Sequence, residues 1–104
     1  MGGGKTEPNG GPFGQVLSGK VGQSPITIKL RLRNYDDSVS GVYFYNKYRS
    51  PISLYGKIKG STIELQEGDS KEKVPPMIRV TINGESLKGL WISGGKQIPF
   101  EAAP

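Results

Sequence analysis

The chain has 104 residues, which is long enough for one small domain and leaves no room for a second. It contains no cysteine and no histidine, which excludes disulfides and thiolate metal sites and removes the usual general base near neutral pH. The formal net charge of +5 is compatible with anionic partners, but it does not choose among nucleic acid, phospholipid, glycan and acidic protein.

The first residues are rich in glycine and proline and have no apolar periodicity. Such a stretch cannot bury enough surface to offset the entropy lost on ordering. We therefore predict a disordered tail over residues 1–12 and a single β-barrel-like domain over residues 13–104. Neither a membrane span nor the hydrophobic core of a signal peptide is present. We expect an exported protein whose signal has been removed, with a cytosolic protein as the alternative.

Residues 15–21 predict a weak strand that closes the barrel. Residues 26–33 form the clearest strand, because apolar residues alternate with polar and basic ones throughout. Residues 39–45 carry large apolar groups on both faces, and Gly41 among them indicates a bend or an aromatic ring lying across the backbone.

Two hairpins follow, over residues 51–67 and 77–93, and each reverses at a glycine-containing turn. Residues 68–76, between the hairpins, hold charges and two prolines and predict an exposed loop. The last strand covers residues 97–101, where Pro99 restricts it to an edge or to the closing seam.

These elements predict an all-β protein, a small antiparallel meander barrel of about seven or eight strands. Closure removes free sheet edges, so we expect a monomer. The predicted core consists of Ile26, Ile28, Leu30, Leu32, Val39, Tyr43, Ile52, Leu54, Ile58, Ile63, Leu65, Ile78, Val80, Ile82, Leu87, Trp91 and Phe100.

No motif for catalysis stands out. The acidic residues Glu64, Glu67, Asp69 and Glu72 lack the spacing of a calcium loop, and we interpret them as a solvated loop. We therefore expect no enzymatic activity, no cofactor and no metal.

The strand over residues 26–33 places Lys29, Arg31 and Arg33 on one outward face. Such a stripe could bind an anionic ligand if further cations adjoin it, with exposed tyrosines such as Tyr35 as stacking surfaces. The alternative is that these charges only keep a β protein soluble. The candidate interaction surface comprises Lys29, Arg31, Arg33, Ser40, Tyr43, Tyr48, Tyr55, Lys57 and Lys59.

Several runs carry a resemblance to known proteins. The segments VSGVYFY (residues 39–45), ISLYGKIKGSTIEL (52–65), LKGLW (87–91) and IPFE (98–101) resemble small uncharacterised β domains of exported bacterial proteins, which pair a G-x-Y-x-Y strand with a G-x-W strand. This resemblance implies a β fold and a periplasmic or secreted location.

A more remote similarity concerns residues 40–43, which read Ser-Gly-Val-Tyr. They are similar to the Ser-Gly-x-x-Tyr loop of the periplasmic and membrane-bound inhibitors of c-type lysozyme, although one residue is missing here and the cysteines of those inhibitors are absent. The similarity implies an inhibitory contact through Ser40.

Three functions follow as hypotheses. The first is a non-enzymatic extracytoplasmic module that binds an unknown protein or anionic ligand. The second is an inhibitor of a cell-wall-degrading enzyme. The third is a binder of nucleic acid or another polyanion through the basic sheet face, and nucleic acid is the less favoured of those ligands.

Overall fold

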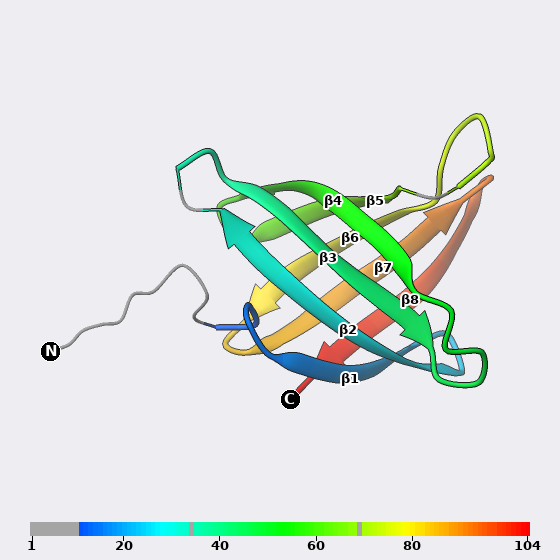
Figure 1. The fold of residues 1–104 in the computed structure, drawn as a ribbon, viewed down its shortest axis with the longest axis horizontal. Coiled ribbons are helices and arrows are strands. Elements are labelled where there is room, and N and C mark those ends of the chain that lie inside the picture. Colours follow the sequence, from blue (N-terminus) through cyan, green and yellow to red (C-terminus); the bar gives the residue numbers. More distant parts are fainter. Residues whose placement is uncertain (1–10, 34, 69) are drawn as a thin grey trace, which may run out of the picture.

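Eight antiparallel strands follow one another around a closed barrel in the computed structural model, which describes residues 11–33, 35–68 and 70–104 (Figure 1). The strands are β1 (Val16–Val21), β2 (Ser24–Arg33), β3 (Ser38–Tyr45), β4 (Ile52–Lys59), β5 (Thr62–Glu67), β6 (Met77–Asn83), β7 (Ser86–Ser93) and β8 (Lys96–Ala103). Each strand pairs with the next, and β1 pairs with β8 to close the ring. The predicted all-β meander barrel is confirmed. These residues include no helix with the length and apolar character needed to cross a membrane.

The connections between strands gather at the two ends of the barrel. The end on the left of Figure 1 carries residues 11–15 and the β2–β3, β4–β5 and β6–β7 turns, and we call it the capped end. The opposite end carries the β1–β2, β3–β4, β5–β6 and β7–β8 connections, and we call it the loop end.

The two predicted hairpins form as expected. In β4–β5 the residues Ile58 and Ile63 face each other, and in β6–β7 Ile82 faces Leu87. Two residues lie between the strands in each hairpin, and each pair begins with a glycine at positive φ, 63° at Gly60 and 65° at Gly84. Tight hairpin turns require this backbone region, which side chains with a Cβ rarely adopt.

The predicted core is confirmed, since every residue assigned to it is buried or packs against the buried cluster. The partly buried members are Leu32, Ile52, Ile58, Ile82 and Trp91. The predicted core omitted four buried hydrophobic residues, Phe13, Leu17, Val21 and Ala102, and two buried prolines, Pro12 and Pro76. In β1 one inward position is a glycine, Gly19. An apolar but exposed residue, Val16, also lies next to the buried Leu17, so the alternation of apolar and polar residues is hard to recognise.

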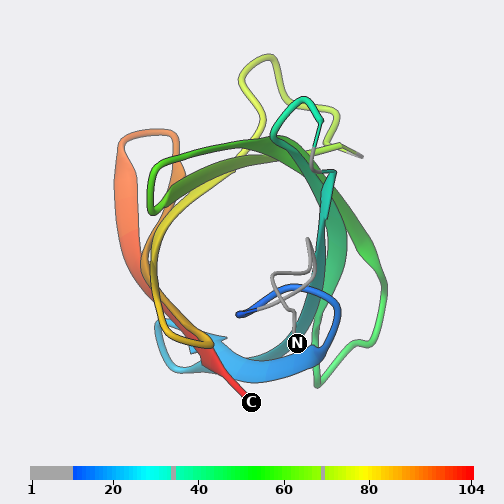
Figure 2. The same ribbon diagram turned by 90° about the vertical axis from the view of Figure 1, so that its left-hand side faces the viewer.

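The segment of residues 11–15, just before β1, closes the capped end. Phe13 is buried and bridges to Leu30, whose carbonyl accepts a 2.8 Å hydrogen bond from the Gly14 amide. Figure 2 looks along the barrel and shows this segment lying across the ring of strands. Pro12 is also buried, so assigning it to the predicted tail was wrong. Residues 1–10 of that tail lie outside the described residues.

Four inward-facing glycines let neighbouring strands approach closely. A Cβ atom would lie 1.8 Å from the Glu101 carbonyl oxygen at Gly19, 2.3 Å from that of Lys29 at Gly41, 1.8 Å from that of Glu64 at Gly56 and 2.0 Å from that of Arg79 at Gly89. Glycines at such inward positions let sheets bend enough to close into barrels. For Gly41 the sequence predicted a bend or an aromatic ring lying across the backbone. The structure shows instead a close approach of the Lys29 backbone to this glycine.

The β5–β6 connection forms the predicted loop and supports a test by amide exchange. Lys71, Lys73 and Val74 are exposed and belong to no strand. We expect their amides to exchange much faster than those of Ile63 and Leu65, which lie in the barrel ladder. Hydrogen exchange followed by NMR measures this difference. Slow exchange at Lys73 or Val74 would contradict the loop and imply a further strand pairing.

Candidate functional site

The outer surface of β2, β3 and β4 is the candidate site. Alternation in β2 buries Ile28 and Leu30, which turns the basic residues between and beyond them to the outside. The three strands together contain five cationic residues and no Asp or Glu. We call these five residues the basic face: Lys29, Arg31, Arg33, Lys57 and Lys59.

Strand register gathers most of the predicted surface residues into neighbouring positions. Arg31 lies opposite Ser40, and Ser40 lies opposite Tyr55 on its other side. One step along the strands, Ser38 separates Arg33 from Lys57 in the same way. Facing residues on adjacent strands have Cβ atoms about 4.5–5.5 Å apart, so these rows form continuous strips of polar and basic groups.

Two hollows lie on this surface, and cations line both. One of about 500 Å³ is lined by Gly14, Lys29, Arg31, Gly41 and Val42. The other, of about 390 Å³, has Arg33, Lys57, Tyr55 and Ser40 among its lining residues. Each hollow has one inward-facing glycine among its lining residues, Gly41 of β3 in the first and Gly56 of β4 in the second.

A wider groove of about 870 Å³ adjoins the basic face along β4 and β5. Both signs of charge line it, with Lys57 and Lys59 against Asp36, Asp37 and Glu64. The basic face is therefore bordered on this side by a mixed surface rather than by a continuation of positive charge.

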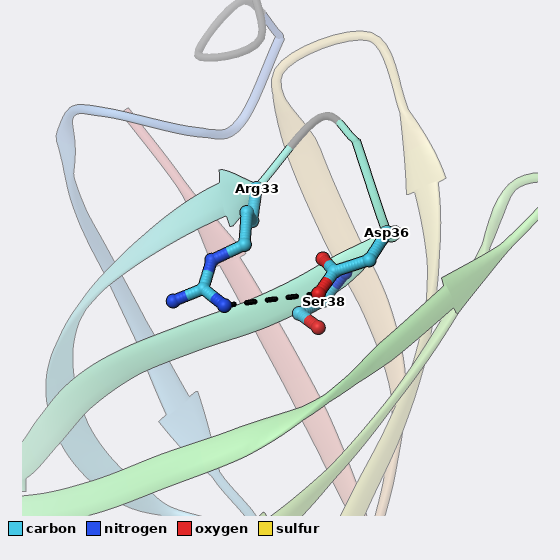
Figure 3. Close-up of polar contacts among 3 residues, drawn as sticks. All are labelled: Arg33, Asp36 and Ser38. Carbon is cyan, nitrogen blue, oxygen red and sulfur yellow. Dashed lines mark hydrogen bonds and ion pairs between the residues drawn. The ribbon is translucent and has the colours of Figure 1, made fainter.

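Carboxylates neutralise the basic face only at its edge. Arg33 lies 3.7 Å from Asp36, whose carboxylate also accepts a 3.1 Å hydrogen bond from the Ser38 amide (Figure 3). The Ser38 amide, then the Ser38 hydroxyl and the charges of Arg33 and Lys57, lower the pKa of Asp36. Within the described residues, the other ion pair joins Arg79 to Glu64 at 2.9 Å. The remaining four cations of the face have no ion-pair partner in this part of the chain.

Two predicted residues lie elsewhere. Tyr43 points into the barrel and is completely buried, so it is a core residue and its assignment to the surface was wrong. Tyr48 is exposed in the β3–β4 connection at the loop end, where the Lys47 ammonium lies 5.5 Å from its ring centre. Tyr35, named as a stacking residue, is exposed at the capped end beneath the Arg33 guanidinium, 5.5 Å from the ring centre.

Ser40 lies in the middle of β3 and is paired on both sides. It does not belong to a protruding loop. Residues 40–43 therefore differ from the inhibitor loop to which they are similar in sequence, and an inhibitory contact through Ser40 stays a prediction.

The sequence did not predict a polar cluster inside the loop end of the barrel. The Tyr43 hydroxyl and the Trp91 indole N–H both donate to Oε2 of Glu67, the latter at 3.1 Å. Burial raises the pKa of Tyr43 far above its usual range, and the bond to Glu67 raises it further. Burial also raises the pKa of the neighbouring Tyr45.

Glu67 was interpreted as part of a solvated acidic loop, and this was wrong. It ends β5 on the same parity as the buried Ile63 and Leu65, and it is half-buried. That parity was the signal available in the sequence. Glu64 lies on the outer face of β5 and Glu72 is exposed in the loop, while Asp69 lies outside the described residues.

Comparison with models of protein families, with curated proteins and with solved structures found no match to this chain. No group of three or more His, Cys, Asp and Glu side chains that could hold a metal ion occurs within residues 11–33, 35–68 and 70–104.

Proposed function

We propose that this protein is a non-enzymatic binding module that holds a polyanion against its basic face. The observation that carries the proposal is the charge distribution over three adjacent strands. These strands present five cations and no acid, and four of the cations have no ion-pair partner among the described residues. A positive surface of this kind attracts phosphate or sulfate groups and releases their counterions.

The spacing of the charges supports a linear ligand. Alternate residues along β2 are about 6.8 Å apart, from the rise of an antiparallel strand. Lys29, Arg31 and Arg33 therefore form a row with a regular repeat. Tyr55, half-exposed beside Ser40, offers a ring face two strands from this row.

Protection of a sheet edge does not explain this surface. Outward lysines commonly protect the free edge of a sheet from pairing with another chain. This barrel is closed, and β2, β3 and β4 each have a neighbour on both sides. Protection of an edge therefore does not account for cations on these strands.

An extracytoplasmic location is part of the same proposal. The resemblance of residues 39–45 and 87–91 to β domains of exported bacterial proteins supports it. A detectable export signal at the start of the precursor, read from the gene, tests it directly.

The basic face is tested by changing Lys29, Arg31 and Arg33 together to Gln. Binding to heparin and to a single-stranded oligonucleotide is expected to weaken at least about tenfold at moderate salt. The slope of log affinity against log salt for the oligonucleotide should flatten by about 0.7 for each lost phosphate contact. Stability should change by no more than about 1 kcal/mol, because exposed charges contribute little.

A matched control changes three exposed lysines outside β2, β3 and β4 to Gln, namely Lys20 on β1, Lys88 on β7 and Lys96 on β8. Both variants remove three positive charges, so each has a formal net charge of +2 (+5 minus 3). The control is expected to keep most of the affinity. If both variants bind the polyanions equally weakly, the loss of affinity comes from overall charge and not from a site on the basic face. A wild-type protein that binds neither heparin nor the oligonucleotide would also contradict the proposal.

A further inference from the structure

The carboxylate of Glu67 is half-buried without a compensating cation. Its Oε2 atom accepts two hydrogen bonds, from Tyr43 and Trp91. The ion pairs of the described residues are Arg33 with Asp36 and Arg79 with Glu64, so none includes Glu67. Burial of a charge is unfavourable unless the charge is paired or well hydrogen-bonded, and here only one of the two oxygens is satisfied.

The second oxygen of Glu67 is reachable from solvent. Oε1 accepts no hydrogen bond from the described residues. In the same part of the chain, no buried side-chain oxygen lacks a partner. Oε1 is therefore not fully enclosed, so Glu67 holds one oxygen in two hydrogen bonds and leaves the other without a partner among the described residues.

Aromatic and aliphatic side chains surround this carboxylate. The Tyr43 and Tyr45 rings lie 5.7 Å apart with an interplanar angle of 57°. Trp91 approaches Glu67 from β7, on the other side of the barrel from β3. Several inward side chains near the loop end are only partly buried, although Val21 and Ile26 at the same end are buried. The partly buried residues form what we call the barrel mouth: Tyr45, Ile52, Glu67, Trp91 and Ile98.

We propose that the barrel mouth binds a small organic ammonium ion that retains at least one N–H group. The ammonium donates to Oε1 of Glu67, and its alkyl chain lies against the apolar and aromatic side chains of the mouth. Electron-rich ring faces attract such cations, and a carboxylate beside them supplies the opposite charge. Hydrated divalent cations suit the mouth poorly, because they require several oxygen ligands and Glu67 offers one carboxylate.

This site is separate from the basic face, since Glu67 and Trp91 point inward whereas Lys29 and Arg31 point outward. The positive net charge of the protein opposes the approach of a cation at long range. Salt screens that repulsion more than it screens the partly buried contact with Glu67. Binding at the mouth should therefore persist at 0.15 M salt and above, where binding at the basic face weakens.

Titration with butylammonium chloride tests the proposal, and Trp91 reports on it as the only tryptophan of the chain. We expect a saturable change in tryptophan emission with butylammonium and none with sodium butyrate or butanol at equal concentration. Tetramethylammonium, which has no N–H group, should bind more weakly than butylammonium. Binding of Nα-acetyl-lysine methylamide as well would identify a peptide lysine as the source of the ammonium, and its failure would identify a free amine.

Glu67→Gln is expected to weaken butylammonium binding at least about tenfold, because the amide keeps an acceptor for Tyr43 and Trp91 but removes the charge. The matched control is Glu64→Gln, three residues earlier on the outer face of the same strand, which should bind like wild type. The triple Gln variant of the basic face should also bind butylammonium like wild type. The experiment therefore tests the barrel mouth separately from the proposed polyanion binding. Equal affinity in Glu67→Gln overturns the proposal. If that variant does not fold, equal responses of the wild type to butylammonium and butanol overturn it.

Discussion

Replacing Gly56 by Ala is expected to prevent formation of the closed barrel. The added Cβ would lie 1.8 Å from the carbonyl oxygen of Glu64 and 2.9 Å from the Cα of Leu65. Both are backbone atoms of the paired strand β5, so no side-chain rotation relieves the contact. Separation of β4 from β5 would break their ladder, and we expect a loss of more than about 4 kcal/mol in the free energy of unfolding. Circular dichroism during urea or thermal unfolding measures it.

The matched control for this variant is Lys57→Ala on the same strand. Lys57 is exposed and points outward, so its removal should change stability by less than about 0.5 kcal/mol. The Gly-to-Ala change also restricts the unfolded chain, which on its own would stabilise the protein by about 0.4–1 kcal/mol. A Gly56→Ala variant as stable as wild type would show that β4 and β5 do not approach as closely as described.

Trp91→Ala is the second change with a large expected effect. Trp91 is partly buried, lies opposite Ile78 and Ile98, and donates its indole N–H to Glu67. Truncation removes a large packed ring and leaves Glu67 with one donor. We expect a loss of about 3 kcal/mol, the lower part of the range for buried aromatics, measured by equilibrium urea unfolding.

Two further variants separate the contributions to this effect. Trp91→Phe keeps most of the ring and removes the donor, so it should cost less than Trp91→Ala. Tyr55→Ala removes an aromatic ring from the outer face and should cost less than about 1 kcal/mol. A Trp91→Ala variant no less stable than Tyr55→Ala would contradict the inward position of Trp91.

Sequence alternation was sufficient for the fold because most strands bury one face only. In β2 the apolar residues Ile26, Ile28 and Leu30 are separated by exposed or half-exposed ones, and the period is visible without a structure. It was insufficient for β1, where an inward glycine replaces the middle apolar residue. Phe13 was missed because it precedes the strand and reaches the core through an isolated bridge to Leu30.

The two candidate sites also differ in how far the sequence alone predicts them. The outward row on β2 was predictable from parity, but the approach of Ser40 and Tyr55 to Arg31 depends on register between three strands. The residue type of Glu67 did not indicate an inward position, since an acid at the end of a strand commonly marks a loop. Its role depends on Tyr43 and Trp91, whose sequence positions are each 24 residues away.

The seam between β1 and β8 has a consequence for how the chain folds. All other pairings join strands that are consecutive in the sequence, whereas the seam joins the two ends of the domain. Its closure is the least local step and is expected to come last. Until then, β8 is an edge open to pairing with other chains.

The Pro99 carbonyl accepts a hydrogen bond from the Gly22 amide across the seam. The N–H and C=O groups of one residue point to the same side of a strand, so the backbone nitrogen of Pro99 also faces β1. Proline has no N–H, so the edge that β8 exposes before closure lacks a hydrogen-bond donor at this position. Pro99 thereby leaves the β7–β8 ladder intact and makes the unfinished barrel a poorer template for aggregation.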